Sequence, residues 1–182
     1  TACRLLTQAK FLITCTKSCQ KNYPGNETNI ENALTTKGLT MSKLTMVEAL
    51  NLAMDQEMAR DENVCMLGED IGINGGVFRT TKDLQKKHGE DRVMDTPLAE
   101  CGIVGAAIGM AIYGIRPVIE IQFSGFTMQA FDQIEQNMAR LRNRTQGKYT
   151  LPMVLRTPYG GGIRAVEHHS ESREAYWAHT PG

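Results

Sequence analysis

Apolar residues at helical spacing alternate with short apolar runs along residues 45–182. The segment 45–60 opens with a capping box of the form T-x-x-E and continues with apolar residues three and four apart, which predicts an amphipathic helix. Four short apolar runs, at 64–67, 92–94, 117–123 and 152–156, predict buried strands. Further helices are expected at 80–88, 101–115, 127–144 and from residue 170 or 171 to 179.

This order of elements predicts an α/β fold. The strands are mostly too apolar to face water on either side, so we expect a parallel sheet with helices on both faces. The chain stops where another strand would follow, which predicts a sheet that is incomplete at the C-terminus. Ligands of such sheets bind beyond the carboxyl ends of the strands. Glu100, the turn 123–126 and the loop with His168 and His169 each follow a predicted strand and could converge there.

The segment Asp95-Thr-Pro-Leu-Ala-Glu100 is the most informative in the chain. It places a lone carboxylate between the end of a strand and the first turn of a helix, 101–115, that contains no charged residue. Burial raises the pKa of a carboxyl group, whereas a helix N-terminus favours its charged form. A carboxyl group held between these two effects can share a proton with a bound base.

Composition excludes several classes of function. The 182 residues are 41% hydrophobic and 22% charged, with a formal net charge of zero, so no bulk charge attracts nucleic acid or an anionic membrane. The apolar helix 101–115 would span about 22 Å, less than the roughly 30 Å of a bilayer core. The five cysteines contain no C-x-x-C pair, so we expect ordinary reduced thiols in an intracellular protein and no bound metal.

Residues 1–40 differ from the rest of the chain. They hold five basic and two acidic side chains, are rich in Thr and Asn, and show no sustained periodicity. Three interpretations stay open: translated upstream or vector sequence with Met41 as the true start, an organelle transit peptide, or a disordered arm. We therefore predict two parts, an N-terminal extension at 1–40 that is disordered or artefactual and a domain at 41–182.

Other motifs allow more than one interpretation. No dinucleotide-binding or P-loop glycine pattern occurs, so the chain lacks an obvious phosphate site. Gly105 and Gly109 lie one turn apart on the apolar helix, where they could serve a helix–sheet contact or a subunit interface. Adjacent His168 and His169 make a poor joint metal site; one could act in acid–base chemistry, or both could be solvated. Phe126, unlike its neighbours, could face a ligand ring.

Several motifs together resemble one family, the beta subunits of the thiamine-dependent, decarboxylating component of 2-oxoacid dehydrogenase complexes. The similarity extends from Met41 to Gly182, and within the family we expect a pyruvate dehydrogenase of bacterial or archaeal type. The remainder of this domain and a carboxy-terminal domain would follow in the family. The motifs are Leu67-Gly-Glu-Asp70, Gly75-Gly-Val-Phe-Arg79, Asp95-Thr-Pro-Leu-Ala-Glu100, Gly102-Ile-Val-Gly105, Glu120-Ile-Gln-Phe123, Phe131-Asp-Gln133, Arg156-Thr-Pro158, His169-Ser170 and His179-Thr-Pro-Gly182.

The resemblance implies a pyrimidine-binding domain of the thiamine diphosphate fold and assigns roles to five residues. Glu100 would share a proton with N1′ of the cofactor's aminopyrimidine. Phe126 would pack on that ring, with Leu98 and Gln129 at neighbouring contact positions. His169 would assist proton handling and acyl transfer to lipoamide, although an exchange of roles with His168 is open.

The resemblance also implies partners. The active site would lie between this subunit and an alpha subunit, in an α₂β₂ heterotetramer, with the diphosphate and its Mg²⁺ held by the alpha subunit. The complex would include a lipoyl-bearing acyltransferase core. The expected location is the cytoplasm, or the mitochondrial matrix if 1–40 is a transit peptide. Open alternatives are a branched-chain 2-oxoacid or acetoin dehydrogenase, a transketolase-like synthase, or an inactive fragment that acts only in assembly.

Overall fold

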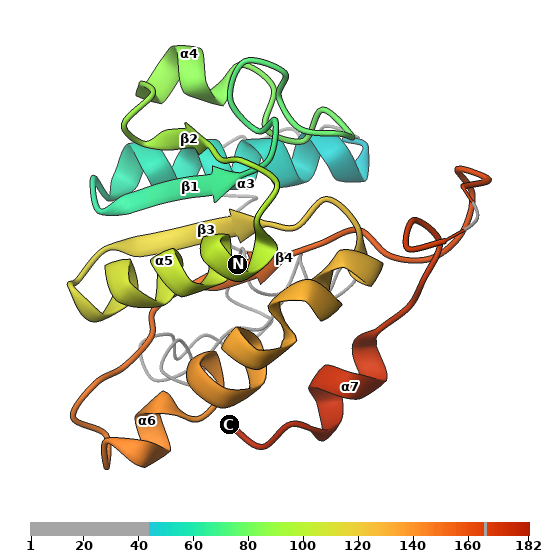
Figure 1. The fold of residues 1–182 in the computed structure, drawn as a ribbon. Helices are drawn as coiled ribbons and strands as arrows, with labels where there is room; N and C mark the ends of the chain where they lie inside the picture. Colours follow the sequence, from blue (N-terminus) through green and yellow to red (C-terminus); the bar gives the residue numbers. More distant parts are fainter. Residues whose placement is uncertain (1–43, 166) are drawn as a thin grey trace, which may run out of the picture.

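A four-stranded parallel sheet forms the centre of the protein (Figure 1). The structure is a computed structural model and describes residues 44–165 and 167–182. The spatial order of the strands is β2-β1-β3-β4. Their bounds are β1 Val64–Gly68, β2 Val93–Asp95, β3 Arg116–Glu120 and β4 Val154–Arg156. All three neighbouring pairs are parallel, as predicted.

The chain changes direction across the sheet between β1 and β3. It passes from β1 outward to β2, crosses back over β1 to β3, and continues to β4. The carboxyl ends of β1 and β3 lie side by side, because Gly68 is paired with Glu120. In doubly wound sheets this reversal is where ligands bind.

Helices cover both faces of the sheet, which confirms the predicted fold class. Alternate residues of β1 enter two separate apolar clusters: Val64 and Met66 pack on the side of α3, Cys65 and Leu67 on the side of α5. Figure 1 shows α3 behind the sheet and α5 in front of it. The bounds are α3 Met46–Arg60, α4 Leu84–His88 and α5 Glu100–Ile112.

The ends of α3 and α5 follow from local sequence. The Thr45 side chain accepts a hydrogen bond from the Glu48 N–H and the Glu48 carboxylate accepts one from the Thr45 N–H, so the predicted capping box is present. Helix α5 ends at Ile112 and is followed after Tyr113 by Gly114, whose φ of +105° suits glycine. There the N–H of Ile115 bonds to the carbonyl of Met110, and that of Gly114 bonds to Ala111, as in a Schellman motif.

The predicted helix 127–144 is helical but is not one regular α-helix. It begins earlier, as the 3₁₀-helix η2 (Ser124–Ala130), widens into the π-helix η3 (Gln133–Met138), and ends in α6 (Leu141–Arg144). The hydroxyl of Thr127 donates to the carbonyl of Ser124 at 2.6 Å and thereby favours the tight first turn. The N–H of Ala139 bonds to Ile134, five residues back.

Two other predicted helices are shorter than expected. In 80–88 only Leu84–His88 is helical, because Asp83 has a φ of +64° and the hydroxyl of Thr81 binds the carbonyl of Ile71. The last helix, α7, spans Glu174–His179. No helix among the described residues is long and apolar enough to cross a membrane. The predicted extension 1–40 lies outside the described residues.

Candidate active site

Glu100 is the first residue of α5 and is buried, with 6% of its surface exposed. The short segment 96–99 leads to it from the end of β2, where the N–H of Thr96 still bonds to the carbonyl of Gly68. Helix N-terminal N–H groups favour a carboxylate in this position. Glu100 therefore lies where the sequence predicted it, at the boundary between strand and helix.

A second buried carboxyl group, Glu69, lies close enough to Glu100 for the charge of Glu100 to affect the pKa of Glu69. Glu69 follows β1 directly, is 3% exposed, and neither of its oxygens has a hydrogen-bond partner among the described residues. Burial raises the pKa of the Glu69 carboxyl, and the charges of Glu100 and Asp70 raise this pKa further. The Ala99 N–H lowers the pKa, although it forms no hydrogen bond of normal geometry with Glu69.

Sequence reasoning did not name Glu69 as a site residue. The signal that could have found it is an acidic residue directly after a fully buried strand. The charge of Glu100 adds to burial in favouring the protonated form of Glu69.

Phe126 and His169, which come from distant parts of the chain, meet in direct ring contact. Their ring centroids are 5.1 Å apart in an edge-on arrangement. Phe123 contacts both rings, at 5.8 Å from Phe126 and 4.4 Å from His169. The start of η2 is tied to the chain beyond β4 by a hydrogen bond from the Ser124 N–H to the carbonyl of Pro158, which brings these segments together.

The imidazole of His169 is held in one tautomer. Its Nδ1 lies 2.6 Å from the carbonyl oxygen of Glu167. A carbonyl oxygen only accepts, so Nδ1 carries the proton, and in the neutral ring Nε2 presents a lone pair. His168 differs from His169: it is exposed, has a φ of +62°, and has a ring centroid 6.0 Å from that of Phe126. His169 is thus the more enclosed of the two histidines.

Leu98 and Gln129 lie on the segments that flank this site, but they face outward. Leu98 is 82% exposed and Gln129 is also exposed. No ring contact or hydrogen bond joins either residue to Phe126 or His169 in the described part of the chain. Their side chains therefore take no part in the ring contacts of this site within the described chain.

The ends of β3 and β4 carry a buried ion pair. Glu120 and Arg156 are 2% and 5% exposed, and the Nη1 of Arg156 contacts the Oε2 of Glu120. Burial lowers the pKa of Arg156 to about 10. The carboxylate of Glu120 also faces Gly76, where a Cβ atom would lie 3.2 Å from Oε1 and where φ is +79°. The glycine-rich loop 70–82, which contains Gly76, therefore lies beside the carboxyl end of β3.

The residues at this edge fit the pyrimidine end of a thiamine cofactor. A buried carboxyl group at a helix N-terminus, with a second one unpaired beside it, can share a proton with a ring nitrogen, and a half-buried phenylalanine offers an aromatic surface. Among residues 44–165 and 167–182, no cluster of three His, Cys, Asp or Glu residues could hold a metal ion.

Comparison with known proteins agrees with this geometry. Residues 42–182 match the family described as transketolase, pyrimidine binding domain, and the chain belongs to that family. It is also 54% identical over 142 residues to the pyruvate dehydrogenase E1 component subunit beta of Acholeplasma laidlawii, and 50% identical over 142 residues to the protein of the same name from Bacillus subtilis. Each match covers 78% of this chain, which spans only 43% and 44% of those relatives. The predicted family resemblance is confirmed.

Proposed function

We propose that this chain forms the pyrimidine-binding part of the beta subunit of a thiamine diphosphate-dependent 2-oxoacid dehydrogenase, with pyruvate as substrate. The observation that carries the proposal is the buried carboxyl group of Glu100 at the start of α5, within the segment that matches the family. The relatives named above are pyruvate dehydrogenase subunits, which supports pyruvate among the possible 2-oxo acids.

The residues of this chain would act on the cofactor at its pyrimidine ring. When bound, thiamine diphosphate supplies the carbon nucleophile that attacks the 2-oxo acid and the ring that accepts the electrons released with carbon dioxide. Glu100 would hold a proton at N1′, and Phe126 would pack on the ring. Nε2 of His169 would accept or donate a proton near the reacting centre, since Nδ1 is bound to Glu167.

A partner subunit would complete the site. The exposed side chains of Leu98 and Gln129 and the exposed Gly102 and Gly109 of α5 support a surface that a second chain covers. We propose an alpha subunit that holds the diphosphate and Mg²⁺, an α₂β₂ assembly, and acyl transfer to the lipoyl groups of an acyltransferase core.

We also propose a cytoplasmic location and the division of the chain at residue 41.

Reconstitution tests the proposed function. The whole protein that contains this chain is assembled with its alpha subunit, thiamine diphosphate and Mg²⁺, and reduction of an artificial electron acceptor is followed with pyruvate and with branched-chain 2-oxo acids. We expect pyruvate to give the highest kcat/KM and the beta subunit alone to give no turnover. A preference for branched-chain acids would refute the substrate, and turnover by the beta subunit alone would refute the shared site.

A further inference from the structure

The aromatic contacts around His169 extend one residue further, to Phe78 in the glycine-rich loop 70–82. The rings of Phe78 and Phe123 are 5.8 Å apart in an edge-on arrangement with an interplanar angle of 74°. Phe78 is 37% exposed, whereas Phe123 is only 8% exposed. Phe123 in turn lies against the imidazole of His169 at 4.4 Å. Phe78 is thus the outermost ring of a series that ends at the candidate proton-transferring group.

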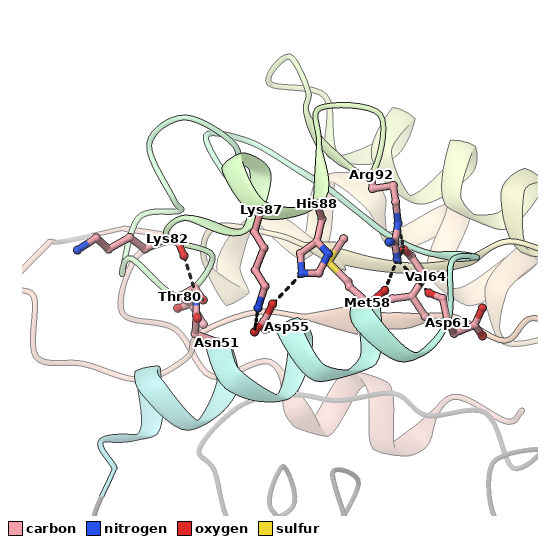
Figure 2. A network of polar contacts seen from close by, with 10 residues as sticks. All are labelled: Asn51, Asp55, Met58, Asp61, Val64, Thr80, Lys82, Lys87, His88 and Arg92. Atoms are coloured by element: carbon pink, nitrogen blue, oxygen red, sulfur yellow. Dashed lines mark hydrogen bonds and ion pairs between the residues drawn. The ribbon is translucent and has the colours of Figure 1, made fainter.

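The loop that carries Phe78 is held from two sides. The side-chain amide of Asn51 on α3 donates to the carbonyls of Thr80 and Lys82, at 2.8 and 3.1 Å (Figure 2). On the other side, the carboxylate of Asp95 at the end of β2 accepts a hydrogen bond of 2.6 Å from the N–H of Gly72. These anchors lie before and after Phe78, so its backbone is fixed although half the loop is exposed.

His169, by contrast, has few restraints of its own. It lies outside any helix or strand, in a loop closed by a hydrogen bond from the Gly160 N–H to the carbonyl of Glu171. Its side chain is directed by the bond from Nδ1 to the carbonyl of Glu167 and by the rings of Phe123 and Phe126. The orientation of the imidazole therefore depends on where the ring of Phe123 lies.

We propose that Phe78 is a positioning residue that fixes the imidazole of His169 through the ring of Phe123. Without the ring of Phe78, Phe123 loses its contact on that side and can turn away from His169, because a vacated contact leaves the neighbouring side chain free to relax. This inference deepens the proposed function, on which it rests, by adding a residue that acts on His169 through the ring of Phe123.

The test uses the whole protein assembled with its partner subunit and three variants: Phe78→Ala, Phe78→Tyr and the matched control Val77→Ala. Val77 is the preceding residue of the same loop and is 41% exposed, close to the value for Phe78. Displacement of a catalytic group by about 1 Å can lower a rate by up to about 10²-fold. We expect Phe78→Ala to lower kcat about tenfold with little change in KM, and Phe78→Tyr and Val77→Ala to retain kcat.

A second measurement reads the position of His169 without activity. Histidines are modified with diethyl pyrocarbonate in the assembled protein, and the rate at each histidine is followed by peptide mass spectrometry. We expect Phe78→Ala to change the rate at His169 at least threefold and to leave His88, whose side chain is 7% exposed, unchanged. Phe78→Tyr should restore the original rate at His169.

The outcomes separate this inference from the proposed function. An active wild-type enzyme in which Phe78→Ala alters neither kcat nor the modification of His169 overturns the positioning role and leaves the proposed function standing. A wild-type assembly that turns over no 2-oxo acid refutes the proposed function, while the modification rates still decide whether Phe78 positions His169. Equal effects of Phe78→Ala and Val77→Ala would also overturn the inference, because the loop as a whole would then be responsible.

Discussion

Behind the sheet, where α3 packs against the segment 80–92, polar groups find partners within the chain; at the carboxyl edge of the sheet, some do not. The guanidinium of Arg92 donates to the carbonyls of Met58, Asp61 and Val64 at 2.7–2.9 Å (Figure 2). At the carboxyl edge, both oxygens of Glu69 are buried without a hydrogen-bond partner among the described residues.

This difference in hydrogen bonding distinguishes polar groups that stabilise the fold from polar groups that are candidates for binding a ligand. An unpaired buried carboxyl group destabilises a protein. We therefore interpret the one at the expected ligand-binding edge as a candidate ligand-binding group. Arg92 and the ion pairs of Asp55 instead hold α3 to the segment 80–92. Substitutions on the α3 side should therefore change stability and leave turnover intact, whereas Glu100 at the carboxyl edge should show the reverse.

Glu100→Gln should give the largest effect. The amide has the shape of the carboxyl group but cannot exchange a proton with N1′, so we expect kcat of the assembled enzyme to fall by about 10²-fold or more, on the scale of acid–base catalysis. Steady-state kinetics with pyruvate measure this. Glu90→Gln, an exposed residue before β2, is the control and should retain normal kcat. If Glu100→Gln also kept normal kcat, the catalytic role of this carboxyl group would be refuted.

Arg92→Met should lower stability most. It removes charged hydrogen bonds to three carbonyl oxygens, and we expect the free energy of unfolding to fall by about 2–3 kcal/mol, the range of a few such bonds after partial compensation by water. Urea unfolding measures the change, with Lys86→Met on the exposed side of α4 as control. A loss of kcat per folded molecule comparable to that of Glu100→Gln would contradict the division between the two regions.

Asp55→Asn should have a smaller effect that depends on pH. Hydrogen bonds from Lys87, at 2.5 Å, and from His88, at 2.7 Å, lower the pKa of the Asp55 carboxyl. The stability that this gives is present above the unfolded pKa of about 3.9 and is lost as the pH falls through the lower folded pKa. We expect Asp55→Asn to reduce stability by about 1 kcal/mol at pH 7, because Lys87 is largely exposed, and by much less near pH 3. An equal loss at both pH values would contradict this electrostatic account; Asp91→Asn is the control.

Glu69→Gln should show the opposite sign. The folded pKa of Glu69 is raised, so the folded state binds more protons than the unfolded chain between the unfolded pKa, about 4.3, and the folded value. The stability that protonated Glu69 contributes is complete below the unfolded pKa and is lost as the pH rises through the higher folded pKa. We expect the variant to be more stable relative to wild type at pH 7 than at pH 4, from unfolding curves at both values. A relative loss at pH 7 would show that the ionised form is favoured.

The parts that could be predicted from the sequence are those set by local patterns. The capping box at Thr45 and the position of Glu100 at the start of α5 both depend on residues within a few positions. The winding of 124–144 could not be predicted, because the spacing of its apolar residues also suits a regular α-helix and the competing hydroxyl of Thr127 leaves no periodic signal.

The positions of some candidate site residues could also be expected from the sequence. Glu100, Phe126 and His169 follow strand ends, so their common edge could be expected from topology. Glu69 could have been found from its place directly after a fully buried strand. Phe78 could not be assigned, since its ring contact with Phe123 depends on the long-range packing of the loop 70–82. Leu98 and Gln129 face outward within this chain, and their predicted contacts with the cofactor stay a prediction.

The central claim is that Glu100 meets the pyrimidine ring of a thiamine cofactor in a pocket completed by a second chain. A crystal structure of the assembled protein with bound thiamine diphosphate tests this most directly. We expect a carboxylate oxygen of Glu100 within hydrogen-bond distance of N1′, with Phe126 against the ring. A structure in which Glu100 points away from the cofactor, or in which the cofactor binds elsewhere, would contradict the account.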